Sequence, residues 1–235
     1  MVSPPSHTPE RNSMPDAPSY DYLTDGAAIY AESFRLIREE SDLGRFPDDV
    51  AKVVARMIHA AAQTNLVEDI AWTPGVVTAA RAALVAGAPI LCDSSMVATG
   101  IIRSRLPRDN DVICHLGTPG LAELADELGT TKTAAAVEWW KPRLEGAVVA
   151  IGNAPTSLFR LLEVVRDTGL KPAAVVGIPV GFVGAAESKA ALAKNPFGLD
   201  FITVLGRRGG SAIAVAAVNA IASTAETTNE ARTDA

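Results

Sequence analysis

A ridge of polar side chains is the first feature of this sequence that could carry out chemistry. Lys52, Arg56, His59 and Gln63 recur at intervals of three and four residues, so on a helix they share one face. The imidazole of His59 can donate or accept a proton near neutral pH, and Arg56 would point toward the same ligand. The charge of Arg56 lowers the pKa of the imidazole, whereas a polyanionic ligand would raise it. The pattern allows two interpretations, a solvated polar face or the wall of a binding pocket.

Other polar positions are similarly open. Ser33 places a hydroxyl on an otherwise apolar helix face, where it either bonds to its own helix backbone or contacts a ligand. Arginines could bind carboxylates through paired N–H groups or simply be solvated; they cluster at Arg103, Arg105 and Arg108 and again at Arg207 and Arg208.

Five predicted strands end in segments rich in glycine, asparagine and proline, which begin at Asp93, His115, Gly152, Gly177 and Gly206. Ligands of open parallel sheets bind beyond the carboxyl ends of the strands. Glycine lets the backbone approach a ligand, and the helix N-termini that follow attract anions. Each segment alone could be an ordinary turn, but five at one edge of a sheet predict a binding crevice.

Several familiar catalytic motifs are absent. There is no GxGxxG after a strand, no GxxxxGK followed by Ser or Thr, and no GxSxG. Of the three histidines, His7 falls in a polar leader, so neither a catalytic triad nor a histidine metal site is expected. Cys92 and Cys114 lie in apolar stretches and are predicted to be reduced thiols. We therefore predict no metal and no cofactor.

Hydrophobic periodicity predicts the elements that position these residues. One helix runs through Ile29 and Glu40, with Thr24 or Asp25 as its cap, and a second begins at Pro47. Short apolar runs then alternate with helical patterns: strands are predicted at 66–72, 89–92, 112–114, 147–151, 173–176 and 201–205, and helices at 74–86, 119–128, 132–144, 155–168, 185–194 and 211–222. This order indicates a single α/β domain, with a mainly parallel sheet, helices on both faces and two extra N-terminal helices.

Composition sets the limits of this domain and of its partners. We predict a disordered leader at 1–20, the folded domain at 21–223 and a flexible tail at 224–235, because both ends are polar and the first is rich in proline. The formal net charge of −6 argues against nucleic acid or an anionic membrane as partner. Neither a secretory signal nor an apolar run of spanning length is seen, which predicts a cytoplasmic protein.

Several motifs, in the same order along the chain, resemble those of the precorrin-8X methylmutase family. They run from about Tyr22 to Ile221 and comprise Ser33–Glu40, Arg56–His59, Ile151–Thr156, Gly177–Gly184, Glu187–Lys189 and Gly206–Ser211. The resemblance implies an α/β fold, a homodimer and a step of cobalamin biosynthesis. Members of the family move a methyl group from C11 to C12 of the corrin macrocycle, which converts precorrin-8X to hydrogenobyrinate. Relatives act on the cobalt-containing counterpart.

The resemblance also implies roles for three residues. The histidine of the family motif is the acid–base residue, here His59, while the arginine three residues before it and a serine of the first helix contact substrate, here Arg56 and Ser33. Lys132 and Thr133 depart from the Arg-Ser pair common in the family and receive no role. His115 lies outside the matched motifs and is interpreted as structural.

The methyl migration is a 1,5-sigmatropic shift, which needs no redox cofactor, metal or covalent nucleophile. A proton or hydrogen bond given to a ring nitrogen would withdraw electron density and ease the shift. The many carboxylates of the substrate would explain arginines gathered at one crevice of an acidic protein. Three alternatives remain at this stage. The first is the cobalt-precorrin-8 methylmutase of the oxygen-independent pathway, and the second is a corrinoid carrier without catalytic activity. The third is an unrelated α/β enzyme that binds phosphorylated metabolites at the strand-end glycines.

Overall fold

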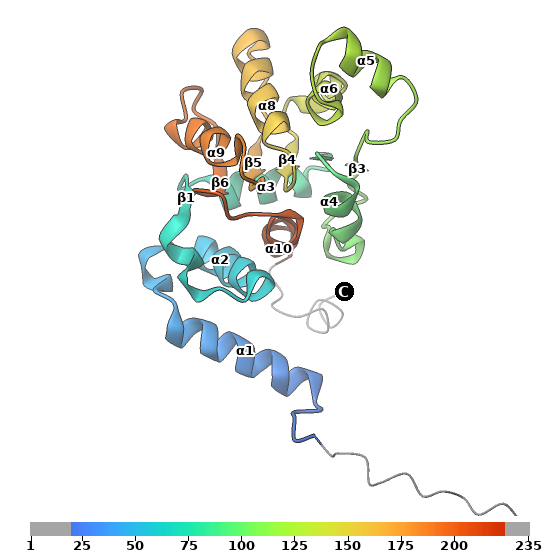
Figure 1. The fold of residues 1–235 in the computed structure, drawn as a ribbon. Coiled ribbons are helices and arrows are strands. Elements are labelled where there is room, and N and C mark those ends of the chain that lie inside the picture. Colours follow the sequence, from blue (N-terminus) through green and yellow to red (C-terminus); the bar gives the residue numbers. More distant parts are fainter. Residues whose placement is uncertain (1–19, 224–235) are drawn as a thin grey trace, which may run out of the picture.

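The structure, a computed structural model, describes residues 20–223 and is built around one six-stranded sheet (Figure 1). Its strands lie in the order β1-β6-β5-β4-β2-β3; they are β1 (Ile70–Trp72), β2 (Ile90–Cys92), β3 (Val112–Ile113), β4 (Val148–Ile151), β5 (Ala174–Gly177) and β6 (Phe201–Val204). All neighbouring pairs are parallel except β1 and β6, which are antiparallel. The predicted α/β domain with a mainly parallel sheet is confirmed. The predicted leader and tail lie outside the described residues, apart from Tyr20.

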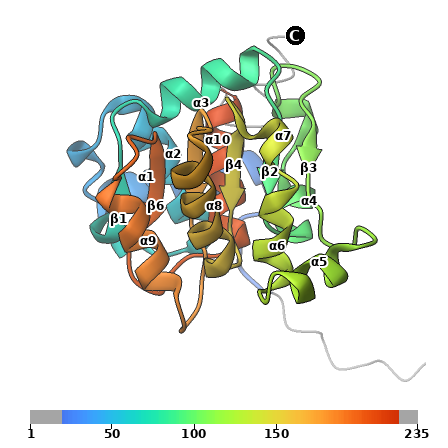
Figure 2. The same ribbon diagram turned by 90° about the horizontal axis from the view of Figure 1, so that it is seen from above.

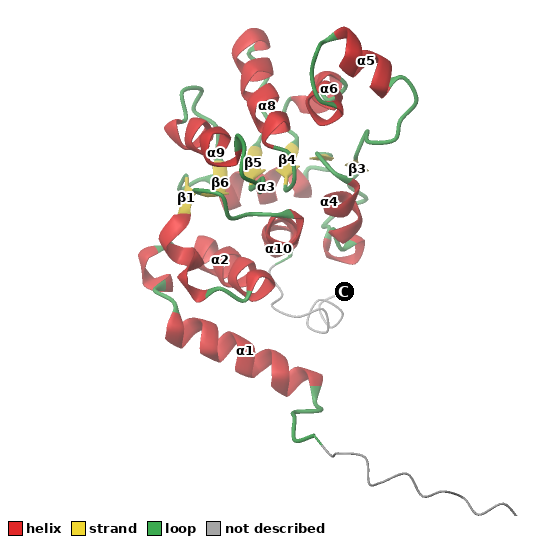
Figure 3. Cartoon of the chain, viewed as in Figure 1, coloured by secondary structure: helices red, strands yellow, loops and turns green. Residues whose placement is uncertain are grey.

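Helices cover both faces of the sheet, as Figures 2 and 3 show. One face is covered by α3, α4 and α10 and the other by α6, α8 and α9, while α2 packs on α10 and α1 packs on α2. The bounds are α1 (Gly26–Glu40), α2 (Asp48–Ala61), α3 (Val76–Val85), α4 (Ser95–Gly100), α5 (Leu121–Glu127), α6 (Lys132–Glu138), α7 (Lys141–Leu144), α8 (Pro155–Thr168), α9 (Ala185–Lys194) and α10 (Ser211–Ala222). Short 3₁₀ turns are η1 (Leu43–Arg45), η2 (Thr64–Asp69) and η3 (Arg103–Arg105). Two helices precede the first strand, as predicted.

The strands are apolar on both faces because each face is covered. Along β4, Val148 and Ala150 join the core beneath α10, whereas Val149 and Ile151 join the core beneath α8. This alternation explains why the sequence shows continuous apolar runs and not an alternation of apolar with polar residues.

Two predicted elements are shorter than expected. The helix predicted at 132–144 is divided into α6 and α7, because Pro142 has no N–H to donate to the carbonyl four residues earlier and disfavours helical geometry in the residue before it. The strand predicted at 66–72 begins only at Ile70. Residues 64–69 form η2 instead, which carries the chain from the end of α2 up to the edge of the sheet. The short helix α4 was not predicted from the sequence.

A buried carboxylate joins the two central strands at their carboxyl ends. The chain leaves β2 toward β3 on one side and leaves β4 toward β5 on the other, so a crevice is expected between β2 and β4. Asp93, 1% exposed, occupies this position and accepts hydrogen bonds from the backbone N–H groups of Gly152, Asn153 and Ala154 at 2.7–3.0 Å. Burial raises the pKa of the Asp93 carboxyl and outweighs these three donors, which lower it. The N–H groups that we expected to face a ligand are therefore bound by a side chain of the protein itself.

Substituting Asp93→Ala leaves three N–H groups without their acceptor, and those of Gly152 and Ala154 are buried. We expect the free energy of unfolding to fall by about 3 kcal/mol, because each unsatisfied buried donor is costly. Urea denaturation measures this loss, with Asp109→Ala, at an exposed position, as the control. A loss no larger than that of the control would show that Asp93 does not hold the two strand ends together.

Candidate functional site

The side chain of His59 lies on an aromatic surface supplied by α1. Its imidazole stacks on the Phe34 ring, with centroids 5.1 Å apart and planes 25° apart, and it meets the Tyr30 ring at 5.6 Å. Tyr30 and Phe34 stack on each other at 4.6 Å because residues four apart share a helix face. The guanidinium of Arg56 lies over the same two rings, 5.4 Å from Tyr30 and 5.6 Å from Phe34. The predicted pairing of Arg56 with His59 is thus present, held in place by cation–π and stacking contacts.

The environment of His59 favours the neutral imidazole in the free protein. Burial against the aromatic surface lowers the pKa of His59, and the positive charge of Arg56 lowers it further. The effect expected from Arg56 is present, although burial is the larger cause. The ring is otherwise exposed and can be reached by a ligand.

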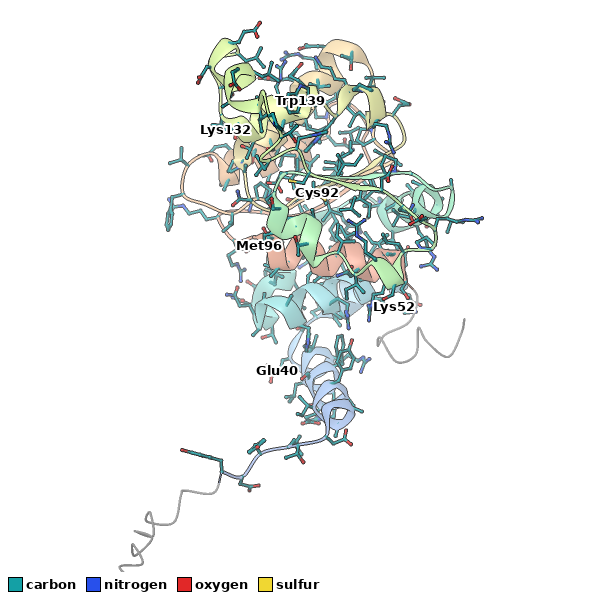
Figure 4. The ribbon with its side chains drawn as sticks, turned by 90° about the vertical axis from the view of Figure 1, so that its right-hand side faces the viewer. Glu40, Lys52, Cys92, Met96, Lys132 and Trp139 are labelled. Atoms are coloured by element: carbon teal, nitrogen blue, oxygen red, sulfur yellow. The ribbon has the colours of Figure 1, made fainter. Side chains whose placement is uncertain are left out.

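Arg56 lines a cavity of about 660 Å³ that lies between α1, α2, α3 and the end of α10; we call it the α1–α2 cavity. Phe34 and Lys52 line the same cavity, and Figure 4 shows Lys52 on α2 near the segment that carries η3. A cavity of this size is in the range of pockets for small molecules.

The other end of the ridge borders a second hollow of about 450 Å³, lined by the end of α2 and by two of the glycine-rich loops. We call it the glycine-loop hollow. Gln63 lies in its wall together with Gly181 and Gly209. Gln63 does not continue the helix face as predicted, because α2 ends at Ala61 and Ala62 adopts a left-handed backbone. The ridge from Lys52 to Gln63 therefore runs from one concave site to the other, with His59 between them. His59 itself is not among the residues that line either cavity, so its place in a binding pocket stays a prediction.

Two loops of the glycine-loop hollow are fixed against each other. The N–H of Gly210 donates to the carbonyl of Ile178 at 3.0 Å, and the N–H of Gly181 donates to that of Arg207 at 3.3 Å. Gly209 is required by space, since a Cβ there would lie 2.5 Å from the carbonyl oxygen of Pro179. Of the five strand-end loops predicted to share one crevice, only these two line the hollow.

The remaining predicted residues have defined partners. The Ser33 hydroxyl donates to the carbonyl of Ile29 at 2.8 Å, which is the backbone-bonded alternative, yet Ser33 lies on the helix face that carries Tyr30 and Ile37. His115 packs edge-on against Trp139 at 5.5 Å. Arg207 lies over the Phe182 ring at 5.5 Å. Each of these is a structural contact, and for Ser33 a role in binding stays a prediction.

Two further arginines of the predicted clusters bond to the protein. Arg103 donates to the carbonyl of Asn110, and Arg208 forms an ion pair with Asp69 and a hydrogen bond with the side chain of Asn65. Both cysteines are free thiols, Cys92 buried and Cys114 half-buried. Among residues 20–223, no cluster of three or more His, Cys, Asp or Glu side chains is arranged to hold a metal ion. Nor does this part of the chain contain a helix that is long and apolar enough to cross a membrane.

Comparison with known proteins agrees with the motifs. The family model for precorrin-8X methylmutase matches residues 28–224. The precorrin-8X methylmutase of Sinorhizobium sp is 55% identical over 205 residues, which cover 87% of this chain and 98% of the relative. That of Pseudomonas aeruginosa is 53% identical over 206 residues, which cover 88% and 99%.

The chain belongs to the precorrin-8X methylmutase family. Family membership confirms the predicted isomerase, a methylmutase of cobalamin biosynthesis. Among solved structures, the precorrin-8X methylmutase of Thermus thermophilus aligns with a TM-score of 0.75 at 41% identity, over 84% of this chain and 95% of its own. The cobalt-precorrin-8 methylmutase of Priestia megaterium is 36% identical over 194 residues, which cover 82% of this chain and 85% of the relative.

One residue of the Glu187–Lys189 motif is buried, which the motif did not predict. Lys189, fully buried on α9, donates a hydrogen bond to the carbonyl of Arg208 and so holds the loop that lines the glycine-loop hollow. Burial lowers the pKa of Lys189 to about 8, against a smaller opposing effect of Asp69. A charge pattern in the sequence does not show that this lysine is buried.

The lowered pKa of Lys189 makes stability depend on pH. In the unfolded chain the lysine keeps its proton up to its ordinary pKa of 10.5, so between about pH 8 and 10.5 the unfolded state binds more protons and stability rises with pH. Between pH 7 and 10, we expect the free energy of unfolding of the wild type to rise by about 2 kcal/mol relative to that of Lys189→Met, because methionine cannot titrate. Urea denaturation of both proteins across this range measures the difference. A difference that does not change with pH would contradict the assignment.

Proposed function

We propose that this protein converts precorrin-8X to hydrogenobyrinate by moving a methyl group from C11 to C12. Identity of 55% and 53% to two precorrin-8X methylmutases, against 36% to the cobalt-precorrin-8 methylmutase of Priestia megaterium, supports the cobalt-free substrate. The position of His59 at the centre of the α2 ridge, next to Arg56 and between two concave sites, is the structural observation that carries the proposal.

In this proposal His59 acts as the general acid. The free protein holds the imidazole neutral, through burial and through the charge of Arg56. A ligand rich in carboxylates would neutralise Arg56 and raise the pKa of His59 when it binds. The imidazole could then give a proton or a strong hydrogen bond to a ring nitrogen, which withdraws electron density from the macrocycle and eases the methyl shift. Protonation would thereby be coupled to binding.

Arg56 and Ser33 are proposed to contact the substrate. The guanidinium carbon of Arg56 lies over the Tyr30 and Phe34 rings, which holds the side chain beside His59. A guanidinium can bind a carboxylate through two parallel N–H groups. The hydroxyl of Ser33 donates within its helix but retains lone pairs that can accept a hydrogen bond.

We also propose a homodimer in the cytoplasm. Helix α1 extends away from the body of the domain in Figure 1 and packs mainly on α2. Large apolar side chains are exposed on and before α1 and on the loop after β5: Tyr20, Tyr22, Leu23, Ile29, Leu36, Val180, Phe182 and Val183. Exposed apolar side chains in these two segments favour contact with a second copy of the chain.

Absorption spectroscopy of the protein incubated with precorrin-8X tests the function. We expect the wild type to produce hydrogenobyrinate and His59→Ala to lose about 10²–10⁴-fold in turnover, the range of general acid catalysis. Binding of hydrogenobyrinate should change little, because the imidazole is proposed to act on the transition state. His115→Ala, a histidine outside the ridge, is the matched control and should retain turnover.

Two outcomes of this experiment would overturn parts of the proposal. Full activity of His59→Ala would refute the assignment of the acid. Binding without spectral conversion by the wild type would show a corrinoid carrier and not an isomerase. Cobalt-precorrin-8 offered under the same conditions should be converted less efficiently than precorrin-8X.

A further inference from the structure

Arg105 is a buried positive charge whose partner the described residues do not supply. Its side chain belongs to η3 and is only 5% exposed. Within residues 20–223, its Nε and Nη1 atoms have no hydrogen-bond partner, and it forms no ion pair. Arg103, two residues earlier on the same turn, is exposed and bonds to a backbone carbonyl.

Such an arrangement is costly for the free protein. A buried charged group requires ion pairing or full hydrogen bonding to offset the loss of water. Burial lowers the pKa of Arg105, but a guanidinium stays protonated at neutral pH. The structure therefore holds two donors in place, without acceptors, in a folded core.

Arg105 belongs to the wall of the α1–α2 cavity. Arg105 lines this cavity together with Arg56 and Phe34, which connect it to His59. Five basic side chains and two acidic ones line the cavity: Arg38, Lys52, Arg56, Arg81 and Arg105 against Asp48 and Asp49. Arg81 donates to the carbonyl of Ile221, and Asp49 accepts from the N–H of Val50. Basic side chains thus outnumber acidic ones among the lining residues, and Arg105 is the most deeply buried of the basic ones.

We propose that Arg105 binds a peripheral carboxylate of the corrinoid, which enters the α1–α2 cavity while the macrocycle lies against His59. The inference rests on the proposed function, since it assigns a further contact to the same ligand. A guanidinium matches a carboxylate with two parallel N–H···O bonds, and this geometry is strongest where water is excluded. Arg105 is thereby a binding residue, not the acid.

A structural role for Arg105 makes the opposite prediction for stability. If the side chain supported the end of α10 or the packing around η3, removing its charge would destabilise the ligand-free protein. If the Arg105 charge gains its partner only when a carboxylate binds, Arg105→Gln removes an uncompensated charge from the ligand-free protein. The ligand-free variant should then unfold at the same temperature as the wild type or at a higher one.

The experiment measures hydrogenobyrinate affinity by absorption titration for the full-length wild type, Arg105→Gln and the matched control Arg103→Gln. It repeats the titration with a derivative whose carboxylates are converted to amides. We expect Arg105→Gln to weaken binding of hydrogenobyrinate by about 10- to 100-fold, the range of a hydrogen bond to a charged group. Arg103→Gln should bind like the wild type. The penalty for amidation should be smaller in Arg105→Gln than in the wild type, because the contact is already lost.

Each remaining outcome counts against the inference. Equal affinity of Arg105→Gln and wild type, or an equal penalty for amidation in both, would show that Arg105 does not bind a carboxylate. A lower unfolding temperature of ligand-free Arg105→Gln would assign the residue a structural role. If the wild type does not bind hydrogenobyrinate at all, the proposed function fails, and this inference fails with it.

Discussion

The stack of the His59 imidazole on the Phe34 ring sets the geometry on which the rest of the site depends. It requires α1 and α2 to meet along one line, and it places Arg56 over the same aromatic surface. The aromatic rings exclude water from one face of the imidazole, while the neighbouring guanidinium adds a like charge. Both effects favour the neutral ring until an anion arrives. A carboxylate-rich ligand bound beside Arg56 would therefore raise the pKa of the His59 imidazole, because its charge would offset that of the guanidinium.

The sheet contributes to this site mainly by holding loops in place. At the centre of the sheet, where many α/β proteins bind an anionic ligand, Asp93 binds the free N–H groups itself. The concave sites lie instead along α2, one toward α3 and α10 and the other toward the loops after β5 and β6. The loop after β6 is held in place at Arg208, whose carbonyl accepts a hydrogen bond from Lys189 and whose side chain forms an ion pair with Asp69. The candidate site therefore lies along the two N-terminal helices and not at the carboxyl ends of the central strands, where open α/β sheets usually bind ligands.

Much of the fold could be predicted from the sequence because its signals are local. The apolar stripe of α2 has the period of a helix, and the central strands are apolar at every position, which is typical of strands covered on both faces. The errors came from features that periodicity does not contain. Pro142 divides a predicted helix because it lacks one backbone N–H donor. The antiparallel edge strand β1 is short because residues 64–69 form η2, which connects α2 to the sheet. Within the site, the ridge of Arg56 and His59 was visible from spacing. The burial of Arg105 could not be predicted from the sequence, because the sequence does not distinguish it from the exposed Arg103 and Arg108. Only tertiary packing determines which of these arginines is buried.

The most direct test of the central claim is an NMR titration of the His59 imidazole, in the free protein and in the complex with hydrogenobyrinate. In the free protein we predict a pKa below the ordinary value of 6.5, which burial and Arg56 cause. In the complex we predict a higher pKa and through-space contacts between the imidazole protons and the macrocycle. An imidazole whose pKa and chemical shifts are the same with and without the ligand would contradict the claim that this ring lies against the corrinoid and donates to it.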